Sequence, residues 1–492
     1  MSLGRRAFVF IFFLIGCKEE NLIICKGKDK DIVPFPNNCS GVEDGKVSII
    51  WEFTPSSSLF SLPLSVGDVD GDRKTEVIVE ASEMYYVLNG EDGSILWKFR
   101  TEEKLYFFGL EQFRHLFGCA FSLIGELDCD GKYEICAICG DEKVYAFNGE
   151  NGSILYVGPS DFIPLSMGDI NRDGRDEIIG LLIRKWWKKG EGVIEERRIG
   201  AVNGKNGSFL WVSEPMPPPT WRKISIGELN GDGITDVVVG CGLFDFLPCG
   251  LLALNGKNGS LLWSYTYPEK DIGAVMSPPV LGDLDEDGKL EVVAVTYGHE
   301  IYAFNGEDGS LLWHREDSSV GGDYYSIALA KVKGKFRIIG HGGVVLNERG
   351  DVIFDKSDGA QSPYYPIIGD ANGDGRLDTI VYKVDIIFED EKNYNQLKIY
   401  TVDIEEGSEN LLYEGEKKME VEEIRDSILG DVNNDCILDL VVSITTDRTG
   451  VIKVITLSLG VPVPPPHLLP WPMARHDVKR TSLYTGDPYP PW

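Results

Sequence analysis

The chain is long and strongly acidic. Its 492 residues include 78 acidic and 48 basic side chains, which gives a formal net charge of −30. This charge argues against a nucleic acid or an anionic membrane surface as a partner, because both would repel an acidic protein. The length would suit two or three average domains, but an internal repeat makes length a poor guide to domain number.

Residues 1–16 have the pattern of an export signal. Two arginines precede an apolar run at residues 7–15, which is too short to span a bilayer. The segment Leu14-Ile15-Gly16-Cys17 resembles the lipobox of prokaryotic lipoproteins, which implies a lipid on Cys17. The alternative is an ordinary signal peptide that is cut nearby. We expect an exported protein with a signal peptide at 1–16 and a lipid-anchored tether at 17–46, held in the membrane at the cell surface or the periplasmic face.

A β-strand is predicted at residues 47–53, directly after the tether. Its sequence, Val-Ser-Ile-Ile-Trp-Glu-Phe, has the form of the Trp-containing strand that ends most of the later repeats. The last repeat, from about residue 425 to 458, lacks such a strand and then runs into proline. We therefore predict that the strand at 47–53 completes the last repeat and removes the open edges.

An acidic loop occurs seven times, and its first copy at 67–76 reads Gly-Asp-Val-Asp-Gly-Asp-Arg-Lys-Thr-Glu. Counted from the residue after that glycine, oxygen-bearing side chains occupy positions 1, 3, 5 and 9. Several hard oxygen ligands in a flexible loop suit Ca²⁺, so the sequence predicts up to seven structural calcium ions. The candidate ligands are Asp68, Asp70, Asp72, Glu76; Glu126, Asp128, Asp130, Glu134; Asp169, Asn171, Asp173, Glu177; Glu228, Asn230, Asp232, Asp236; Asp283, Asp285, Asp287, Glu291; Asp370, Asn372, Asp374, Asp378; Asp431, Asn433, Asp435 and Asp439.

The segments between the loops predict four short strands per repeat. After the first loop come a β-branched run at 77–79, a strand that ends at Asn89-Gly90, and a Gly-Ser turn followed by a strand that ends in Trp97. A fourth apolar stretch leads into the next loop, and a stretch at 327–354 has the strand pattern without the acidic ligands. Four strands per cycle are typical of a propeller blade. We predict an all-β, eight-bladed β-propeller at 47–460 with four-stranded blades, followed by a Pro-rich tail at 461–492.

The ten cysteines fit an exported protein. Cys25/Cys39 and Cys241/Cys249 are spaced for local disulfides, whereas Cys436 has no evident partner. The spacing Cys136-x-x-Cys139 also occurs in zinc and redox sites, but here it falls within a predicted strand. Core packing or a disulfide is therefore the favoured interpretation of that pair.

The repeats resemble two known families at once. The acidic loops look like the Ca²⁺-binding FG-GAP repeats of integrin α-subunit propellers, and the Asn-Gly-x-x-Gly-Ser-x-Leu-Trp segments are similar to the tryptophan motif of quinoprotein-like propellers. The resemblance covers 47–460 and implies structural calcium without a catalytic site. Quinoproteins that use pyrroloquinoline quinone commonly carry adjacent cysteines, and this chain has none.

Strand alternation places the acidic loops and the Asn-Gly turns on one face of the ring and the connections of variable length on the other. Because binding commonly uses variable loops, we expect a protein or glycan ligand there, with Trp186, Trp187 and Trp221 as candidate contacts. The competing interpretation is that these residues cover a neighbouring blade. The predicted function is an adhesion or binding module with no catalytic or cofactor-binding residue. The alternatives are a carbohydrate-active or quinone-dependent enzyme and a scaffold for envelope assembly.

Overall fold

The computed structural model describes most of the repeat region and neither end of the chain. The predicted signal peptide, the tether up to residue 45, Cys17, the Cys25/Cys39 pair and residues 465–492 of the predicted Pro-rich tail lie outside the described residues. The described residues are 46–55, 64–81, 84–101, 119–188, 192–216, 219–241, 250–267, 275, 277–296, 298–316, 326–357, 366–389, 392–415, 423–445 and 452–464.

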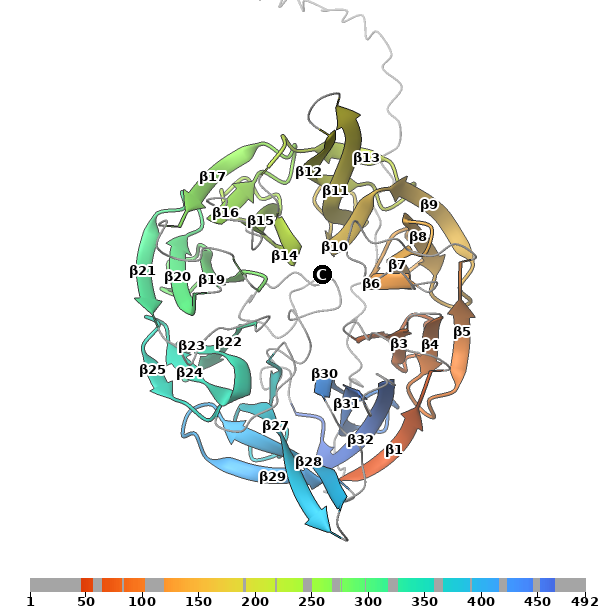
Figure 1. The fold of residues 1–492 in the computed structure, drawn as a ribbon, viewed down its shortest axis with the longest axis vertical. Helices are drawn as coiled ribbons and strands as arrows, with labels where there is room; N and C mark the ends of the chain where they lie inside the picture. Colours follow the sequence, from red (N-terminus) through yellow and green to blue (C-terminus); the bar gives the residue numbers. More distant parts are fainter. Residues whose placement is uncertain are drawn as a thin grey trace, which may run out of the picture.

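The strands form eight antiparallel four-stranded sheets arranged as the blades of a ring (Figure 1). The prediction of an all-β, eight-bladed propeller is therefore confirmed. Blades 1 to 4 comprise β2 (Ser65–Gly67), β3 (Glu76–Glu80), β4 (Tyr85–Asn89) and β5 (Ile95–Phe99); β6 (Cys119–Gly125), β7 (Glu134–Cys139), β8 (Lys143–Asn148) and β9 (Ile154–Ser160); β10 (Phe162–Gly168), β11 (Glu177–Lys188), β12 (Gly192–Val202) and β13 (Phe209–Val212); β14 (Pro219–Gly227), β15 (Asp236–Cys241), β16 (Gly250–Leu254) and β17 (Leu261–Thr266).

Blades 5 to 8 continue the same order around the ring. They comprise β18 (Val280–Gly282), β19 (Glu291–Val295), β20 (Glu300–Asn305) and β21 (Leu311–Glu316); β22 (Ala328–Val332), β23 (Lys335–Ile339), β24 (Val345–Asn347) and β25 (Val352–Phe354); β26 (Ile368–Gly369), β27 (Asp378–Glu389), β28 (Lys392–Asp403) and β29 (Glu409–Glu414); β30 (Glu423–Gly430), β31 (Ile437–Thr445), β32 (Ile452–Pro462) and β1 (Ser48–Phe53). A short 3-10 helix, η2 (His341–Gly343), connects β23 to β24. No helix within the described ranges has the length and hydropathy needed to cross a membrane.

The ring closes by pairing its first strand with its last. β1 pairs antiparallel with β32 and becomes the outermost strand of blade 8, as the sequence predicted. The two strands are about 400 residues apart in the chain, so the closure is a long-range contact. It satisfies the outer edge of β32 with the chain's own strand.

The Asn-Gly turns between the third and fourth strands are built alike. In blade 1 the Asn89 amide donates to the Ser94 carbonyl at 2.8 Å, and the Gly93 amide donates to the Asn89 carbonyl at 2.9 Å. Gly93 has a φ of 69°, a conformation that costs glycine little. The Asn-Gly-x-x-Gly-Ser pattern therefore sets the position at which each fourth strand begins.

Aromatic side chains of the fourth strands join neighbouring blades. The indole Nε1 of Trp97 in blade 1 donates to the Gly149 carbonyl of blade 2 at 2.6 Å. A Cβ on Gly152 would lie only 2.6 Å from the same ring, so the turn needs glycine at this point. Trp51, Trp211 and Trp263 donate in the same way to the turns of blades 1, 4 and 5. Tyr156, Trp313 and Phe354 lie against the corresponding glycines of blades 3, 6 and 7.

The hydrophobic core lies between blades. One cluster of buried residues includes Trp51 and Val454 of blade 8, Val66 and Val87 of blade 1, and Ile135 of blade 2. Side chains on the facing sides of neighbouring sheets therefore bury one another, as in other packed sheets. This packing holds each acidic loop at a fixed place on the ring.

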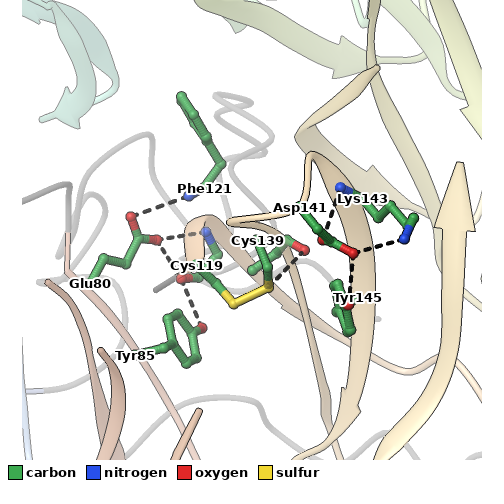
Figure 2. Close-up of a disulfide and its surroundings, with 10 residues drawn as sticks. Glu80, Tyr85, Cys119, Phe121, Cys139, Asp141, Lys143 and Tyr145 are labelled. Atoms are coloured by element: carbon green, nitrogen blue, oxygen red, sulfur yellow. Dashed lines mark hydrogen bonds and ion pairs between the residues drawn. A yellow bond between two sulfur atoms is a disulfide. The ribbon is translucent and has the colours of Figure 1, made fainter. Parts of the chain in front are cut away.

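A disulfide and a buried carboxylate lie where blades 1 and 2 meet (Figure 2). Cys119 and Cys139 are directly opposite one another on β6 and β7 and form a disulfide. Next to it, Glu80 accepts hydrogen bonds from the amides of Phe121 (3.2 Å) and Ser122 (2.7 Å) across the blade boundary. Phe121 has a φ of 60°, so Glu80 fixes the irregular part of β6.

The other cysteines differ in whether they form disulfides. Cys136 is a buried free thiol, so the Cys136-x-x-Cys139 spacing reflects one core residue and one disulfide residue. Cys129 and Cys436 are also disulfide-bonded, although Cys436 had no evident partner in the sequence. Cys241 is buried and its thiol is not disulfide-bonded, so the predicted Cys241–Cys249 disulfide is wrong.

Candidate metal centres

The seven acidic loops occupy equivalent places in the fold. Each connects the first strand of a blade to the second, and the residue at position 9 lies at or near the start of the second strand. In blade 6 the same connection is short, and Lys333 (φ 51°) and Gly334 (φ 80°) make the turn. The ring therefore carries acidic loops in every blade except the sixth.

Three loops bring carboxylate oxygens together. One oxygen from each of positions 1, 3 and 9 lies within 4.8 Å of the others in each group. These groups are Asp68, Asp70 and Glu76; Glu126, Asp128 and Glu134; and Asp283, Asp285 and Glu291. This spacing is compatible with a single cation held by all three carboxylates, since Ca²⁺–oxygen distances are about 2.3–2.6 Å.

The other four loops have asparagine at position 3. Asn171 directs its amide nitrogen to the Glu177 carboxylate at 2.7 Å, and Asn230 does so to Asp236 at 3.2 Å. A cation in these loops would take the amide oxygen, which is also a hard ligand.

Position 9 is the buried part of each loop. Glu76, Glu134, Glu177, Asp236, Glu291, Asp378 and Asp439 are all at most 1% exposed. In six loops this carboxylate accepts the amide of position 2, for example Val69 to Glu76 at 2.9 Å and Leu127 to Glu134 at 2.6 Å. A backbone amide thus binds one oxygen of the position 9 carboxylate, and the second oxygen is left available to a cation.

Position 5 lies outside the three groups of converging oxygens and stays a predicted ligand. Asp72, Asp130 and Asp287 do not belong to the three groups of converging oxygens. In all seven loops this side chain accepts the amide two residues later, for example Lys74 to Asp72 at 2.7 Å. The side chain at position 3 does the same, for example from Asp72 to Asp70 at 3.0 Å. Such side chain–backbone bonds are typical of Asx turns, and here they shape the second half of the loop.

Several ligand oxygens are buried without a hydrogen-bond donor. They are Glu134 Oε1, Asp283 Oδ1, both carboxylate oxygens of Asp378, and Asp439 Oδ1. A buried carboxylate oxygen without a partner is costly. All of these atoms belong to positions 1 and 9 of acidic loops, so the donor set fits a bound cation.

The electrostatics of the loops also favour a bound cation. Burial, followed by repulsion from the neighbouring carboxylates, raises the pKa of Glu76 and Glu177 to about 9. The pKa of Glu134 is also raised to about 9, and those of Asp378 and Asp439 to about 8. Smaller increases, to about 7 and about 6, apply to Glu291 and Asp236. Negative charge at these positions is unfavourable unless a cation compensates it.

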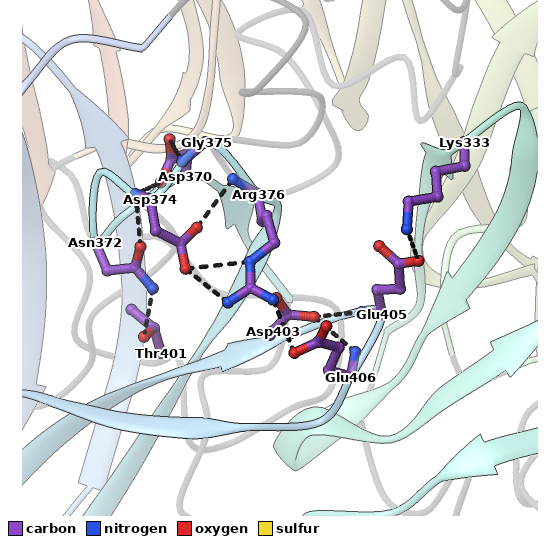
Figure 3. Close-up of polar contacts among 10 residues, drawn as sticks. All are labelled: Lys333, Asp370, Asn372, Asp374, Gly375, Arg376, Thr401, Asp403, Glu405 and Glu406. Carbon is purple, nitrogen blue, oxygen red and sulfur yellow. Dashed lines mark hydrogen bonds and ion pairs between the residues drawn. The ribbon is translucent and has the colours of Figure 1, made fainter.

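Blades 6 and 7 contain basic side chains among the acidic ones (Figure 3). Arg376, in the acidic loop of blade 7, contacts Asp374 at 3.0 Å, Asp403 at 3.1 Å and Glu406 at 2.8 Å. In the turn of blade 6, Lys333 pairs with Glu405 of blade 7. The nearby Lys331 contacts Glu286 of the blade 5 loop at 2.6 Å. Lysines therefore supply positive charge at the one blade without acidic ligands.

The acidic loops and the Asn-Gly turns lie on the same face, as the strand order predicted. Within blade 4 the Gly256 amide donates to Asp236 at 3.0 Å, and Asn255 contacts Asp232 at 3.3 Å. Lys74 of the blade 1 loop pairs with Glu91 of the turn in the same blade. The loops and turns therefore support each other directly.

The aromatic candidates of the opposite face are placed only by their backbones. Trp186 and Trp187 lie in β11, opposite Ile194 and Val193 of β12, and Trp221 lies in β14. The stretches at 184–198 and 384–396 form long hairpins. Most of the other variable connections fall outside the described residues.

Comparisons with known proteins agree with this architecture. A family model described as outer membrane protein assembly factor BamB matches residues 191–326. The chain is 28% identical to mouse Protein FAM234B over 144 residues and 30% identical to the human protein over 146 residues. Each alignment covers 29% of this chain and 22% of the relative. The chain therefore matches about a fifth of the length of these curated relatives.

Solved structures show a similar fold at low sequence identity. A europium-containing methanol dehydrogenase has a TM-score of 0.50 at 12% identity, over 84% of this chain and 93% of that chain. BamB from Moraxella catarrhalis has a TM-score of 0.46 at 14% identity, over 83% of this chain and 99% of that chain. At this identity the likeness shows the fold alone, a β-propeller.

Some features of the site were not predicted from the sequence. The hydrogen bond from position 2 to position 9 and the turn role of position 5 were missed. The regular spacing of seven residues between positions 2 and 9 was the available signal. The basic side chains of blade 6 were visible as Lys331, Lys333 and Lys335, but only the fold shows which carboxylates the first two contact.

Proposed function

We propose that this protein is an exported β-propeller whose acidic loops bind structural Ca²⁺ and whose opposite face binds a protein or glycan. The observation that carries the calcium assignment is the set of buried ligand oxygens without hydrogen-bond donors in loops of blades 2, 5, 7 and 8. Calcium would supply the positive charge that these carboxylates lack, and it would link the start of each loop to the second strand.

The residues that would hold the ion are those at positions 1, 3 and 9. Their donors are all oxygens, and the loops are built from turns that adjust easily, both of which favour Ca²⁺ over softer or more rigidly coordinated metals. Position 5 is a further candidate ligand, and its bond to the backbone, which position 3 makes as well, also shapes the loop. In this proposal the ions have a structural role and do not contact the ligand.

Export to the cell envelope is supported by the sequence pattern at 1–17. The matching family model is described as an outer membrane protein assembly factor, which is consistent with a protein of the envelope. We extend this to a lipid anchor on Cys17. Mass spectrometry of the protein from the membrane fraction tests the anchor: an acylated peptide that begins at Cys17 is expected, and an unmodified Cys17 would contradict it.

The binding face is proposed to be the one opposite the acidic loops. The loops and Asn-Gly turns repeat the same hydrogen bonds in most blades, whereas the other connections differ in length from blade to blade. Uniform connections on one face and variable ones on the other are typical of a scaffold that presents a binding surface.

Thermal unfolding with calcium or with EDTA tests the structural role. Ligands that bind only the folded state stabilise it by about 1.4 kcal/mol per site when present at ten times the dissociation constant. We expect EDTA to lower the melting temperature and added Ca²⁺ to restore it. A melting temperature that does not change with excess EDTA would refute the calcium proposal.

A glycan array, combined with a dehydrogenase assay after addition of pyrroloquinoline quinone, tests the binding role. Retention of a glycan or a co-purifying protein without turnover is the expected result. Cleavage of an arrayed glycan or quinone-dependent turnover would show that the protein is an enzyme. These outcomes do not depend on the calcium result, so the two parts of the proposal are tested separately.

A further inference from the structure

Two acidic loops contain a cysteine. Cys129 occupies position 4 of the blade 2 loop, and Cys436 occupies position 6 of the blade 8 loop; we call them the two loop cysteines. At position 6 five of the other six loops have glycine. Cys129 has a φ of 70° and Cys436 a φ of 68°, a left-handed conformation that is unfavourable for residues other than glycine. Cysteine at these places therefore has a conformational cost, which points to a role for the side chains.

Side chains at these two loop positions project from the face that carries the acidic loops, the acidic-loop face. A Cβ added to Gly288, at position 6 of blade 5, would meet no atom of the described chain within 4 Å, and the same holds for Gly231 at position 4 of blade 4. Cys129 and Cys436 are themselves half-buried. A segment of chain that lies on this face can therefore reach them.

Both loop cysteines are disulfide-bonded. The other cysteines of the described ranges are accounted for: Cys119 is bonded to Cys139, whereas Cys136 and Cys241 carry no disulfide. A bond between the two loop cysteines themselves would need Cα atoms about 4.4–6.8 Å apart. The acidic loop of blade 1 prevents such an approach, because it lies between the loops of blades 8 and 2.

The blade 1 loop contacts both of its neighbours. The Thr75 amide donates to the Val432 carbonyl of the blade 8 loop at 3.3 Å. A Cβ on Gly71 would lie 3.3 Å from the side chain of Lys132 in the blade 2 loop. The partners of the two loop cysteines are therefore cysteines outside the described residues, of which the sequence has four: Cys17, Cys25, Cys39 and Cys249.

Two of these four cysteines are unsuitable. Cys249 is joined directly to Gly250, the first residue of β16, and this end of β16 lies on the face opposite the acidic loops. Cys17 carries the lipid in our proposed function, and a thioether there leaves no thiol for a disulfide; in this one step the inference rests on the proposed function. Cys25 and Cys39 remain, which gives two cysteines for two bonds.

The tether joins the ring on the acidic-loop face. β1 is antiparallel to β32, with Ser48 opposite Ser458. At the end of β32 the Val463 amide donates to the Cys436 carbonyl at 3.0 Å, so this end of the strand lies beside the blade 8 loop. Lys46, the first described residue, therefore lies at the same end of blade 8.

The length and charge of the tether suit a path over this face. Cys39 is seven residues before Lys46, a stretch that spans at most about 25 Å, which favours the loop of the same blade. Cys25 is a further 14 residues away, which is enough to cross blade 1 and reach blade 2. The stretch between the two tether cysteines contains three lysines and two aspartates. It is therefore slightly basic in an acidic chain and is attracted by the acidic loops.

We propose that the tether is fastened across the acidic-loop face by two disulfides, Cys39 with Cys436 on blade 8 and Cys25 with Cys129 on blade 2. These bonds replace the local Cys25/Cys39 disulfide that the sequence spacing suggested. Each bond forms when two thiols lose two protons and two electrons to an external disulfide, which is reduced to a dithiol. With the lipid on Cys17, the acidic-loop face would point toward the membrane and the opposite face away from it.

Disulfide mapping of the full-length protein, alkylated and digested without reductant, tests the pairing. Mass spectrometry should detect a peptide that joins Cys39 to Cys436 and one that joins Cys25 to Cys129. Peptides that join Cys25 to Cys39 or Cys129 to Cys436, or alkylated thiols at Cys25 and Cys39, would overturn the proposal. Both expected peptides with an unmodified Cys17 would refute only the lipid anchor, and an acylated Cys17 without these peptides would refute only the two disulfides.

A site for a specific protease, inserted after Asp31, gives a second test. After cleavage the N-terminal piece should stay joined to the propeller under denaturing conditions without reductant, and reductant should increase its release at least tenfold. The same protein with Cys25→Ala and Cys129→Ala should release the piece without reductant. The matched control, Cys136→Ala, should still require reductant, and circular dichroism confirms that the variants are folded. Release from the parent protein without reductant would overturn the proposal.

Discussion

The indole Nε1 of Trp51 donates a 2.6 Å hydrogen bond to the carbonyl oxygen of Gly90. Trp51 belongs to the strand that completes blade 8, and Gly90 belongs to the turn of blade 1, so this bond crosses the closure of the ring. The same donor and acceptor join blade 1 to blade 2 through Trp97 and Gly149. The ring is therefore closed by the same kind of hydrogen bond that joins two blades that follow one another in sequence.

Replacement of Trp51 tests how much the closure contributes to stability. Trp51→Ala removes a large buried side chain and should lower the free energy of unfolding by about 3–5 kcal/mol. Trp51→Phe keeps much of the ring and loses mainly the hydrogen bond. Chemical denaturation measures both, with Trp97→Ala as the comparison. An alanine variant as stable as the wild type would show that the ring does not depend on this strand.

The effect of calcium should depend on pH. Burial and carboxylate repulsion raise the pKa of Glu76, Glu134 and Glu177 from 4.5 to about 9. Without calcium, the contribution of these groups to the stability of the fold is fully present below the pKa they have in the unfolded chain. This contribution is lost as the pH rises toward 9, their pKa in the folded protein. Calcium needs the deprotonated form, so its binding strengthens with pH.

We therefore expect the calcium-free melting temperature to fall between pH 5 and pH 9. The increase in melting temperature on addition of Ca²⁺ should grow over the same range. Differential scanning fluorimetry in EDTA and in CaCl₂ at several pH values measures both trends. An increase that is equal at pH 5 and pH 8 would contradict this account of the acidic loops.

Glu134→Gln separates the cost of a buried charge from the gain of a bound ion. Glutamine has the same size but no charge, so the variant should bind one Ca²⁺ fewer and gain less stability from calcium. In EDTA near pH 8 it should be at least as stable as the wild type, because an unfavourable buried carboxylate has been removed. Isothermal titration calorimetry and thermal unfolding measure the two effects.

The matched control for that variant is Glu150→Gln. Glu150 pairs with Lys132 near the surface of the same blade, and an exposed pair contributes little. This variant should keep the calcium stoichiometry of the wild type. A Glu134→Gln protein with unchanged stoichiometry would remove Glu134 from the set of ligands.

The disulfide between Cys119 and Cys139 should stabilise blade 2. The two residues are 20 positions apart in sequence, and cross-linking a loop of this length contributes about 3 kcal/mol by restricting the unfolded chain. Cys119→Ala with Cys139→Ala should lower the free energy of unfolding by roughly that amount. The single variant Cys136→Ala, which removes a buried free thiol, should cost less. Equal losses in the two variants would indicate that packing dominates.

Much of the fold could be predicted from the sequence, because each strand and turn of a blade is specified by residues that lie close together within one repeat. A strand ending at Asn89-Gly90, a turn glycine at Gly93 and an indole at Trp97 occur in a fixed order, and each one specifies its own turn or strand. Recurrence of this order gave the number of blades. The unmatched strand at 47–53 then gave the closure, which the pairing of β1 with β32 confirms.

The details of the acidic loops needed the three-dimensional structure. Oxygen side chains at positions 1, 3, 5 and 9 look equivalent in sequence, yet in three loops the oxygens of positions 1, 3 and 9 converge and that of position 5 is not among them. The difference arises because backbone geometry decides where a short side chain points. Contacts between blades, such as Lys331 with Glu286, join segments far apart in the chain.

By itself, then, the sequence determined the all-β class, the eight blades, the closing strand and the candidate ligands, because each of these depends on residues close together in the repeat. Only the tertiary structure decided which oxygens are buried without donors, which blades contact one another, and that the long hairpins β11–β12 and β27–β28 lie on opposite sides of the ring. Those properties depend on how residues distant in sequence pack together, and local residue patterns do not encode that packing in a readable form.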